Sequence, residues 1–377
     1  MHIRYLQCVE CKEKYSKKEI RYRCSCGQSL EVIFNFNEIR NIISWNKLRK
    51  RPFRHWRYRE FFPLVKSENS VTLMEGGTPL LKSRNISREL GFDNLFFKCE
   101  SENPTGSFKD RGTTVEISKA LEFGSNEIVC ASTGNMGASV SAYAAAANIK
   151  AHIILPSDTP DIKTAQIKSY GAKIHRVNGD YNTAEAEAFK LFRTKGWYLM
   201  GDYPYRGEGE KSVGFEIADE IEADYIISPI GNGTLIHGIW KGLKEFKHVK
   251  LTRKLPKLIG IQATGCNTVV KAFKNESDLI KPVKPKTIAG AIACGNPLDG
   301  LEAIQVLRDS NGIAETVTDR EILKAKDYLA KKEGVFAEPA GAVTLAGLIK
   351  LKGQLEKNAR IVLIVSGNGL KTAMLGI

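Results

Sequence analysis

Short apolar runs alternate with amphipathic stretches along most of the chain, which is the pattern of an α/β protein. The runs have the length of buried strands, and most of them lead into a stretch with helical spacing. Predicted strands lie at 94–98, 127–131, 151–155, 173–177, 224–230, 257–262 and 359–365. Predicted helices lie at 113–123, 136–147, 161–170, 182–195, 235–246 and 339–351. A further strand is predicted at 29–34, and residues 35–65 are interpreted as a connector.

The length of 377 residues leaves room for two sizeable domains and a small extra module. No apolar run approaches the roughly 18 residues that a membrane span needs. The first residues also lack the apolar core of a signal peptide. A cytoplasmic location, with no membrane partner, is therefore expected.

The formal net charge is +14, and much of it lies near the N-terminus. Residues 1–60 contain 15 Lys and Arg against 6 Asp and Glu. Such an excess can serve a nucleic-acid contact, a solvated basic face or a general basic bias of the source organism. The basic and aromatic connector at 35–65 has no recognisable nucleic-acid reader motif. We therefore expect its rings to pack on the main body, and nucleic acid is not an expected partner.

Four cysteines form two close pairs, Cys8 with Cys11 and Cys24 with Cys26. Two such knuckles can present four thiolates tetrahedrally, as in a zinc ribbon. The alternatives are disulfides or reduced thiols without metal, and a cytosolic disulfide is disfavoured because thiols there stay reduced. A zinc ion at these four ligands would be structural, since no ligand position is left open. The remaining cysteines are interpreted as small buried apolar residues: Cys99, Cys130, Cys266 and Cys294.

Lys109 lies where a loop gives way to a helix, after the turn-forming residues 103–106. A lysine held in such a turn can bind an aldehyde cofactor through its amine. Most lysines at a helix start are simply solvated, because lysine is almost never buried without a partner. The residue alone leaves both interpretations open.

Two glycine-containing turns follow predicted strands and precede predicted helices. The turn at 131–137 offers unpaired N–H groups and a helix dipole to an anion, although an ordinary helix cap would look the same. The turn at 231–235 can cradle a phosphate. It is neither a Walker A loop nor the dinucleotide fingerprint, because Ile236 stands where the third glycine belongs.

The residues Asn-Pro-Thr-Gly-Ser-Phe-Lys-Asp-Arg-Gly at 103–112 resemble the cofactor-lysine segment of the threonine synthases. These are pyridoxal phosphate (PLP) enzymes of fold type II. Residues 75–81, Glu-Gly-Gly-Thr-Pro-Leu-Leu, resemble a segment common to that fold, and the resemblance covers about 75–377. It implies two three-layer α/β lobes with the cofactor between them, plus an N-terminal zinc-ribbon-like module.

The resemblance also implies the domain boundaries and the assembly. Residues 1–34 would form the ribbon-like module, and 35–65 would form a basic and aromatic arm. The large PLP-binding domain would comprise 66–112 and 200–377, and the small mobile domain would be 113–199. A homodimer is the expected assembly.

The resemblance assigns roles to individual residues. Lys109 would carry PLP covalently and act as the catalytic base. Asn135 would contact the cofactor ring oxygen, and Ser366 the pyridine nitrogen, although Ser366 also fits a polar turn after a buried strand. The cofactor phosphate would be held by Gly231, Asn232, Gly233, Thr234 and Leu235. The substrate would be bound by Ser107, Ser132, Thr133, Gly134 and Arg206.

The segment at 203–211 resembles the one in which threonine synthases hold the substrate phosphate with an arginine, here Arg206. A guanidinium fork suits a phosphate dianion. Met200 and Gly201 stand where family members often carry Asn and Ser, and Glu210 replaces a usual Gln. Glu338 has two interpretations, as a residue lining the cofactor cleft or as a helix-start carboxylate.

The reaction implied is conversion of O-phospho-L-homoserine and water to L-threonine and phosphate, with a small phosphorylated amino acid as the substrate. The departures at Met200, Gly201 and Glu210 leave open a β-replacement on O-phosphoserine, of the cysteate or cysteine synthase type. A third hypothesis is a non-catalytic nucleic-acid-binding or regulatory protein on a PLP fold. That hypothesis predicts no coloured cofactor and a steeply salt-dependent affinity for nucleic acid.

Overall fold

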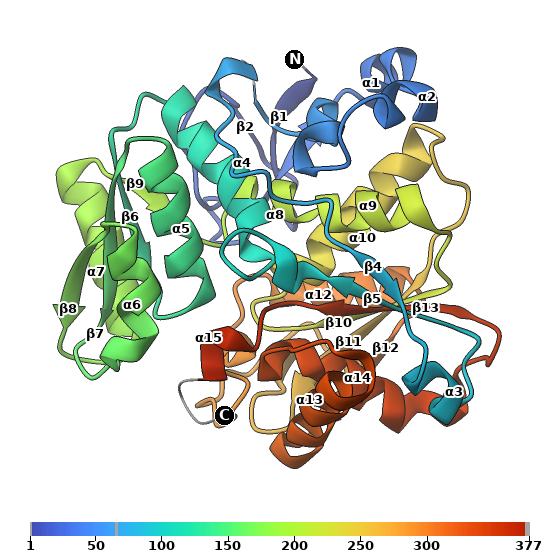
Figure 1. Cartoon of the computed structure of the whole chain (residues 1–377). Coiled ribbons are helices and arrows are strands. Elements are labelled where there is room, and N and C mark those ends of the chain that lie inside the picture. The colour runs from blue at the N-terminus through green and yellow to red at the C-terminus, as the bar shows by residue number, and fades with distance from the viewer. Residues whose placement is uncertain (1, 65–66, 374–377) are drawn as a thin grey trace. The chain divides into compact units, whose positions relative to one another are not determined.

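The computed structural model describes residues 2–64 and 67–373, and within them the chain divides into two compact units (Figure 1). The first unit comprises the chain up to Ile43 with Lys47–Glu75 and Lys109–Glu210. The second comprises Ser44–Asn46, Gly76–Phe108 and the chain from Lys211 onward. The predicted boundary between 65 and 66, and the predicted domain end at 374–377, lie outside the described residues. The predicted domain boundaries stay predictions.

The main sheet of the first unit has four parallel strands in the order β8-β7-β6-β9. The strands are β6 (Glu127–Ala131), β7 (Lys150–Pro156), β8 (Lys173–Val177) and β9 (Tyr198–Met200). The helices are α4 (Lys109–Glu122), α5 (Asn135–Ala146), α6 (Asp161–Ser169), α7 (Tyr181–Lys195) and α8 (Pro204–Glu210), with the short 3-10 helix η2 (Ser67–Asn69). Strands β6 and β7 are almost wholly buried, as expected for a parallel sheet with helices on its faces.

The cysteine-rich N-terminal segment forms a small antiparallel sheet in the order β2-β1-β3. Its strands are β1 (Ile3–Cys8), β2 (Lys14–Tyr15) and β3 (Leu30–Phe34), which confirms the strand predicted at 29–34. Tyr22 joins this segment to the main sheet of the same unit. Its hydroxyl accepts a hydrogen bond from the Leu199 N–H at 2.9 Å, and its ring packs edge-on against Tyr198.

The predicted connector at 35–65 contains helical turns: α1 (Phe36–Ile42), α2 (Trp45–Arg49) and the 3-10 helix η1 (His55–Phe61). Its aromatic rings pack on the protein. Tyr58 and Phe61 are buried, and His55 stacks on Phe62 with ring centroids 4.2 Å apart. In the second unit, Trp45 Nε1 donates to the Leu251 carbonyl at 2.8 Å. The rings of Trp45, Phe53 and Trp56 are half-buried.

The second unit has a six-stranded sheet in the order β12-β11-β10-β13-β5-β4, with only the edge strand β4 antiparallel. Its strands are β4 (Leu80–Lys82), β5 (Asn94–Cys99), β10 (Tyr225–Pro229), β11 (Lys257–Ala263), β12 (Ile313–Val317) and β13 (Arg360–Val365). Its helices are α3 (Ile86–Leu90), α9 (Ser212–Glu220), α10 (Thr234–His248), α11 (Thr268–Lys274), α12 (Gly300–Asp309), α13 (Asp319–Glu333), α14 (Pro339–Leu351) and α15 (Leu370–Ala373). Its 3-10 turns are η3 (Glu100–Glu102), η4 (Gly290–Ile292) and η5 (Lys352–Gln354).

Alternate residues of the central strands enter different cores. In β13, Ile361 and Leu363 belong to a cluster with residues of α13 and α14, whereas Val362 and Ile364 belong to a cluster with residues of α10 and α12. This alternation follows from the two-residue period of a strand. Helices therefore cover both faces of the sheet, with α13 and α14 on one side and α10 and α12 on the other (Figure 1). The predicted α/β class, with a three-layer arrangement in this unit, is confirmed.

Across the described residues, no helix is both long enough and apolar enough to cross a membrane.

Candidate active site

The segment that leads to Lys109 is fixed within the second unit by the buried carboxylate of Glu100. Thr78 Oγ1 donates to Glu100 Oε1 at 2.7 Å, and Asn103 Nδ2 donates to Glu100 Oε2 at 2.9 Å. Asn103 Oδ1 accepts from the Gly76 N–H at 3.0 Å. These bonds hold the predicted turn at 103–106, in which Gly106 has a φ of +83° that suits glycine.

The last residues before Lys109 pair with the chain that follows β13. The Phe108 N–H donates to the Ser366 carbonyl at 3.0 Å, and Ser107 forms an antiparallel bridge with Gly367. Ser107 is fully buried, and among the described residues its Oγ atom has no hydrogen-bond partner. Because buried hydroxyls are nearly always bonded, this Oγ atom is suited to bind a ligand.

Ser366 directly follows β13 and is buried. Beside it, the Glu338 N–H donates to the Gly367 carbonyl at 2.9 Å. A Cβ atom at Gly367 would lie 2.2 Å from Glu338 Oε1. Glu338 directly precedes α14, as a helix-start carboxylate does. It also lies next to Gly367, the residue after Ser366, so it is equally compatible with lining the cofactor cleft.

The turn at Gly231–Leu235 joins β10 to α10. Gly233 has a φ of +101°, and a Cβ atom there would lie 2.2 Å from the Asp299 carbonyl oxygen. Thr234 Oγ1 donates to Asp299 Oδ2 at 2.8 Å, and the Asp299 N–H donates to the Asn232 carbonyl at 3.0 Å. The turn is therefore a rigid backbone cradle at the start of a 15-residue helix. The N–H groups and dipole at such a helix start favour a phosphate group.

Sheet topology brings this turn close to Ser366 within the second unit. Strands β10 and β13 are parallel neighbours, so the turns after them lie at the same edge of the sheet. Ligands of open α/β sheets bind outside this carboxyl edge. The predicted phosphate turn and the predicted pyridine-nitrogen serine are therefore on one side of one sheet.

In the first unit, helices α4 and α8 approach so closely that glycine is required between them. A Cβ atom at Gly209 would lie 1.9 Å from the Arg111 carbonyl oxygen. A Cβ atom at Gly112 would lie 2.6 Å from Arg206 Cγ. Because of this packing, Lys109 at the start of α4 lies beside Glu210 at the end of α8.

Two carboxyl groups lie next to the Lys109 amine. Its Nζ atom is 3.7 Å from Glu210 Oε1 and 3.8 Å from Asp202 Oδ1. Glu210 is fully buried, and within the described chain neither of its carboxyl oxygens has a hydrogen-bond partner. Burial raises the pKa of the Glu210 carboxyl to about 7, while the charge of Lys109 acts in the opposite direction. An acid that titrates near neutrality therefore lies beside the amine.

Arg206 is fully buried and paired with Glu116. Its Nη2 atom is 2.6 Å from Glu116 Oε2. Its Nε donates to the Gly201 carbonyl at 3.0 Å and its Nη1 to Thr113 Oγ1 at 3.2 Å. Burial raises the pKa of Glu116 to about 7, although the Arg206 charge opposes this. A phosphate that binds Arg206 must therefore compete with a carboxylate already bound to it.

The loop between β6 and α5 is held by its own serine. Ser132 Oγ accepts from the Gly137 N–H at 2.9 Å and from the Gly134 N–H at 3.3 Å. Thr133 and Asn135 are half-buried. One turn into α5, Ser139 Oγ donates to Asp110 Oδ1 at 2.6 Å. This bond joins the starts of α4 and α5, and it brings the predicted loop into the same part of the first unit as Lys109.

Each unit therefore gathers its own group of predicted residues. Ser107, Glu338, Ser366 and the turn Gly231–Leu235 belong to the second unit, and the others belong to the first. Sequence reasoning missed Glu116 and Asp202 as site residues and treated Glu210 only as a departure from a family pattern. The available signal was the four-residue spacing of Arg206 and Glu210, which places them on one face of α8, whereas Asp202 precedes that helix.

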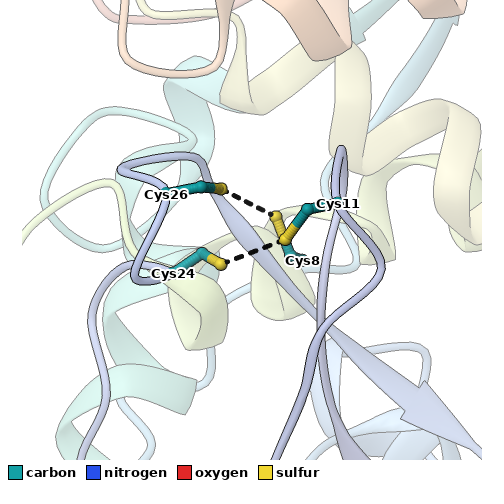
Figure 2. Close-up of side chains that lie close together, drawn as sticks. All are labelled: Cys8, Cys11, Cys24 and Cys26. Carbon is teal, nitrogen blue, oxygen red and sulfur yellow. Dashed lines mark hydrogen bonds between the residues drawn. The ribbon is translucent and has the colours of Figure 1, made fainter.

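The four predicted zinc ligands converge, as Figure 2 shows. The sulfur atoms of Cys8, Cys11, Cys24 and Cys26 all lie within 4.8 Å of one another. Cys8 and Cys26 Sγ are 3.6 Å apart, and Cys11 and Cys24 Sγ are 3.4 Å apart. Tetrahedral zinc with Zn–S bonds of about 2.3 Å separates its sulfur ligands by about 3.8 Å. The cluster therefore has the dimensions of a zinc site.

Comparison with known proteins defines the class. Residues 71–367 match the family model described as "Pyridoxal-phosphate dependent enzyme". The structure of maize serine racemase is similar with a TM-score of 0.70 and 26% identity, covering 79% of this chain and 90% of that chain. Threonine deaminase isoform 2 from Solanum lycopersicum gives a TM-score of 0.68 at 22% identity, covering 79% of this chain and 86% of that chain, which shows the shared fold. The protein is an α/β enzyme of fold type II, and its cofactor is pyridoxal phosphate.

The chain belongs to the pyridoxal-phosphate-dependent enzyme family. Curated relatives named threonine synthase include that of Methanocaldococcus jannaschii, 44% identical over 97% of this chain and 92% of the relative. The threonine synthase of Methanosarcina acetivorans is 42% identical, again over 97% of this chain and 92% of the relative. The predicted resemblance is confirmed.

Proposed function

We propose that the protein is a threonine synthase, converting O-phospho-L-homoserine and water to L-threonine and phosphate. The observation that carries this proposal is the 44% identity to a threonine synthase over 97% of the chain. The loop that presents Lys109, with its buried Glu100–Asn103 network, supports an amine held in a fixed place. A non-catalytic protein with a PLP fold would not need Lys109 or the hydrogen-bond network that precedes it.

Within each unit, the described residues suit one part of the cofactor. We assign its phosphate to the Gly233 cradle, where a side chain would strike Asp299 and a small anion has N–H donors. We assign its ring nitrogen to Ser366, its ring oxygen to Asn135 and its aldehyde to the Lys109 amine. When bound, PLP supplies an electron sink for charge at the substrate Cα atom. A serine hydroxyl is neutral and cannot keep the ring nitrogen protonated, which favours loss of a leaving group over transamination.

The protein's own residues would act in the following order. The Lys109 amine takes the Cα proton and then moves a proton at Cβ. Ser107, Ser132, Thr133 and Gly134 orient the substrate, and Arg206 with neighbouring N–H groups stabilises phosphate as it leaves Cγ. Water then adds at Cβ. Closing of the predicted mobile domain would exclude water before that last step.

The second candidate is a β-replacement on O-phosphoserine. The observation favouring it is Arg206, whose guanidinium is already bonded to Glu116 and to the Gly201 carbonyl. Gly201 and Met200 also provide no polar side chain where family members often carry Asn and Ser. Fewer groups near Arg206 are therefore available to bind the phosphate of O-phosphohomoserine than family members often have.

Phosphate release from the two substrates decides between them. We expect wild-type protein to release phosphate and form threonine from O-phosphohomoserine, with kcat/KM at least about tenfold above that for O-phosphoserine. The reverse ratio contradicts the proposal.

Arg206→Ala should lower kcat/KM for O-phosphohomoserine about 10–100-fold, the value of a hydrogen bond to a charged group. It also leaves Glu116 buried without its cation, which costs about 3–5 kcal/mol. The double variant Arg206→Met, Glu116→Gln restores stability but not kcat/KM if Arg206 binds the phosphate.

We also propose that Cys8, Cys11, Cys24 and Cys26 hold one structural zinc ion. Hydrogen bonds support a thiolate at Cys24: although burial would raise its pKa, the Tyr15 hydroxyl and the Cys26 N–H lower it to about 6. Thiolates are the form that binds zinc. None of the eight cysteines forms a disulfide, which is consistent with the expected cytoplasmic location.

The expected homodimer is checked by the size of the protein in solution.

Metal analysis tests the zinc proposal. We expect about one zinc per chain in the purified protein. Cys24→Ser should lower this to near zero and lower the thermal unfolding midpoint, because metal binding is coupled to folding. Cys294→Ser, which changes a cysteine outside the cluster, should keep the zinc. A wild-type protein without zinc, purified in its presence and without chelator, would contradict the proposal.

A further inference from the structure

A buried cluster of charged groups surrounds the Lys109 amine in the first unit. It consists of Lys109, Glu116, Asp202, Arg206 and Glu210, linked by separations of 4.0 Å or less. Apart from Lys109, whose side chain is 15% exposed, its members are almost fully buried. We refer to these five residues as the acid cluster.

Charge balance requires the acid cluster to hold an extra proton. It contains two basic groups, Lys109 and Arg206, and three carboxyl groups. If every group were ionised, one negative charge would remain in a water-poor interior, where an uncompensated charge is strongly unfavourable. One carboxyl group is therefore expected to be protonated at neutral pH, or to share its proton with the lysine.

Hydrogen bonding identifies Glu210 as the carboxyl group that holds this proton. Glu116 accepts from Arg206 Nη2 at 2.6 Å and from the Gly201 N–H at 3.0 Å, which favours its ionised form. Asp202 lies between two cations, 3.8 Å from Lys109 Nζ and 4.0 Å from Arg206 Nε. Glu210 faces Lys109 at 3.7 Å, and among the described residues its two oxygens accept no hydrogen bond. It is thus the least stabilised carboxylate of the three.

The position of Glu210 is fixed by the backbone rather than by a flexible contact. A Cβ atom at Gly112 of α4 would lie 3.2 Å from Glu210 Oε1, so the carboxyl group packs directly on α4. The close contact at Gly209, one residue earlier, prevents α8 from moving away. The carboxyl group therefore stays near the start of α4, where the Lys109 amine lies.

We propose that Glu210 is a positioning residue that exchanges a proton with Lys109. When the amine must be neutral to bond to carbon or to take a proton, an ammonium N–H bond of Lys109 breaks and an O–H bond forms on Glu210. The proton returns by the reverse transfer, so the charge of the pair does not change. The proposal rests on the proposed function only in taking Lys109 as the reactive amine.

The pH dependence follows from this exchange. Below the pKa of Glu210 the pair holds two protons, one on the carboxyl group and one extra on the amine. As the pH rises through about 7 one proton leaves the pair. The remaining proton stays mainly on the amine, where the Glu210 carboxylate stabilises it, and its transfer to the carboxyl group supplies the neutral amine. Glu116, Asp202 and Arg206 are the other charged groups that face Glu210 and contribute to the position of this step.

Competitive labelling of the full chain after removal of PLP tests the proposal without enzyme activity. The protein is treated with trace acetic anhydride from pH 5 to 11, and labelling is read by peptide mass spectrometry. Lys150, whose side chain is 78% exposed, is the internal reference. We expect Lys109 of the wild type to gain reactivity in two steps, the first of which ends in a plateau near pH 7, where Glu210 ionises. Glu210→Gln should lack the plateau, because no carboxylate then holds the proton on the amine, and its reactivity at pH 8 should be higher by about tenfold, the factor of one pH unit.

Two further variants locate the effect. Asp202→Asn should keep the step near pH 7, and Glu210→Asp should restore it because the carboxyl group is retained. Equal profiles for wild type and Glu210→Gln, or loss of the step only in Asp202→Asn, would overturn the proposal. If the Gln variant does not fold, as judged by circular dichroism, the Asp variant decides: absence of the step there also overturns it.

The rate of PLP attachment separates this proposal from the proposed function. Added PLP should bond to Lys109 with the same pH step, followed by visible absorption. If the labelling step is present but no threonine is formed, the proposed function fails and the proton exchange stands. If threonine is formed and the labelling profiles are equal, the proton exchange fails and the proposed function stands.

Discussion

Lys109→Ala protein is expected to be colourless and inactive. Removing the amine removes both the covalent bond to PLP and the base, and proton transfer by a positioned side chain alone contributes about 10²–10⁴-fold to a rate. Threonine formation should therefore fall by at least about 10³-fold. Visible absorption, which borohydride abolishes in the wild type, should be absent from the variant.

Two controls make the Lys109 result specific. Lys109→Arg keeps the positive charge beside Asp202 and Glu210 but cannot form the bond, so it should also be colourless while remaining folded. Lys150→Ala removes an exposed lysine and should leave colour and activity unchanged. Recovery of the borohydride-reduced cofactor on a peptide that lacks Lys109 would rule out the assignment.

Gly209→Ala is expected to cause a large loss of stability. The new Cβ atom would lie 1.9 Å from the Arg111 carbonyl oxygen, a backbone atom that cannot rotate away. Helices α4 and α8 would have to separate, which costs about 3 kcal/mol or more for such overpacking. The separation would also displace Lys109 from Glu210, so PLP absorption should decrease.

Gly353→Ala is the matched control. A Cβ atom at Gly353 meets no atom within 4 Å, so the free energy of unfolding should change by no more than about 0.5 kcal/mol. Urea denaturation followed by circular dichroism measures both variants under the same conditions. Equal midpoints for Gly209→Ala and Gly353→Ala would show that the contact between α4 and α8 is not tight in solution.

The sequence predicts the buried strands and the longer helices well. The predicted helix at 339–351 coincides with α14, and the strand at 127–131 coincides with β6. Such segments are determined by local apolar patterns, which a single sequence displays. The convergence of the four cysteines was likewise predictable, because each pair is only a few residues long.

Helix α8 (Pro204–Glu210) shows where local patterns fail. Its residues include Gly207 and Gly209, and glycine inside a helix costs about 1 kcal/mol relative to alanine. Pro204 at the first helical position favours a helix start, but the two glycines disfavour the turns that follow. Gly209 becomes favourable only because it allows the Arg111 backbone to approach, and this contact joins residues almost a hundred positions apart. The same long-range packing gives Glu210 its place beside Lys109, so the sequence presented it only as an unusual substitution.

The candidate site shows a similar division. Lys109, Asn135, Ser366 and the turn at Gly231–Leu235 could be proposed from motifs, because each lies at a strand-to-helix or strand-to-turn junction. The pairing of Arg206 with Glu116 could not, since it depends on how α8 packs on α4. Charge pairing inside a protein is decided by tertiary contacts, and a motif shows only the residue types.

The Tyr22 contact has a practical consequence for shortened chains. Its ring packs on Phe192 and Tyr203, and its hydroxyl accepts the Leu199 N–H. Deleting the first 34 residues would uncover these rings and leave an amide without its acceptor. A truncated protein would therefore expose these aromatic rings to solvent and aggregate more readily. The N-terminal segment is needed to keep the rest of the first unit soluble.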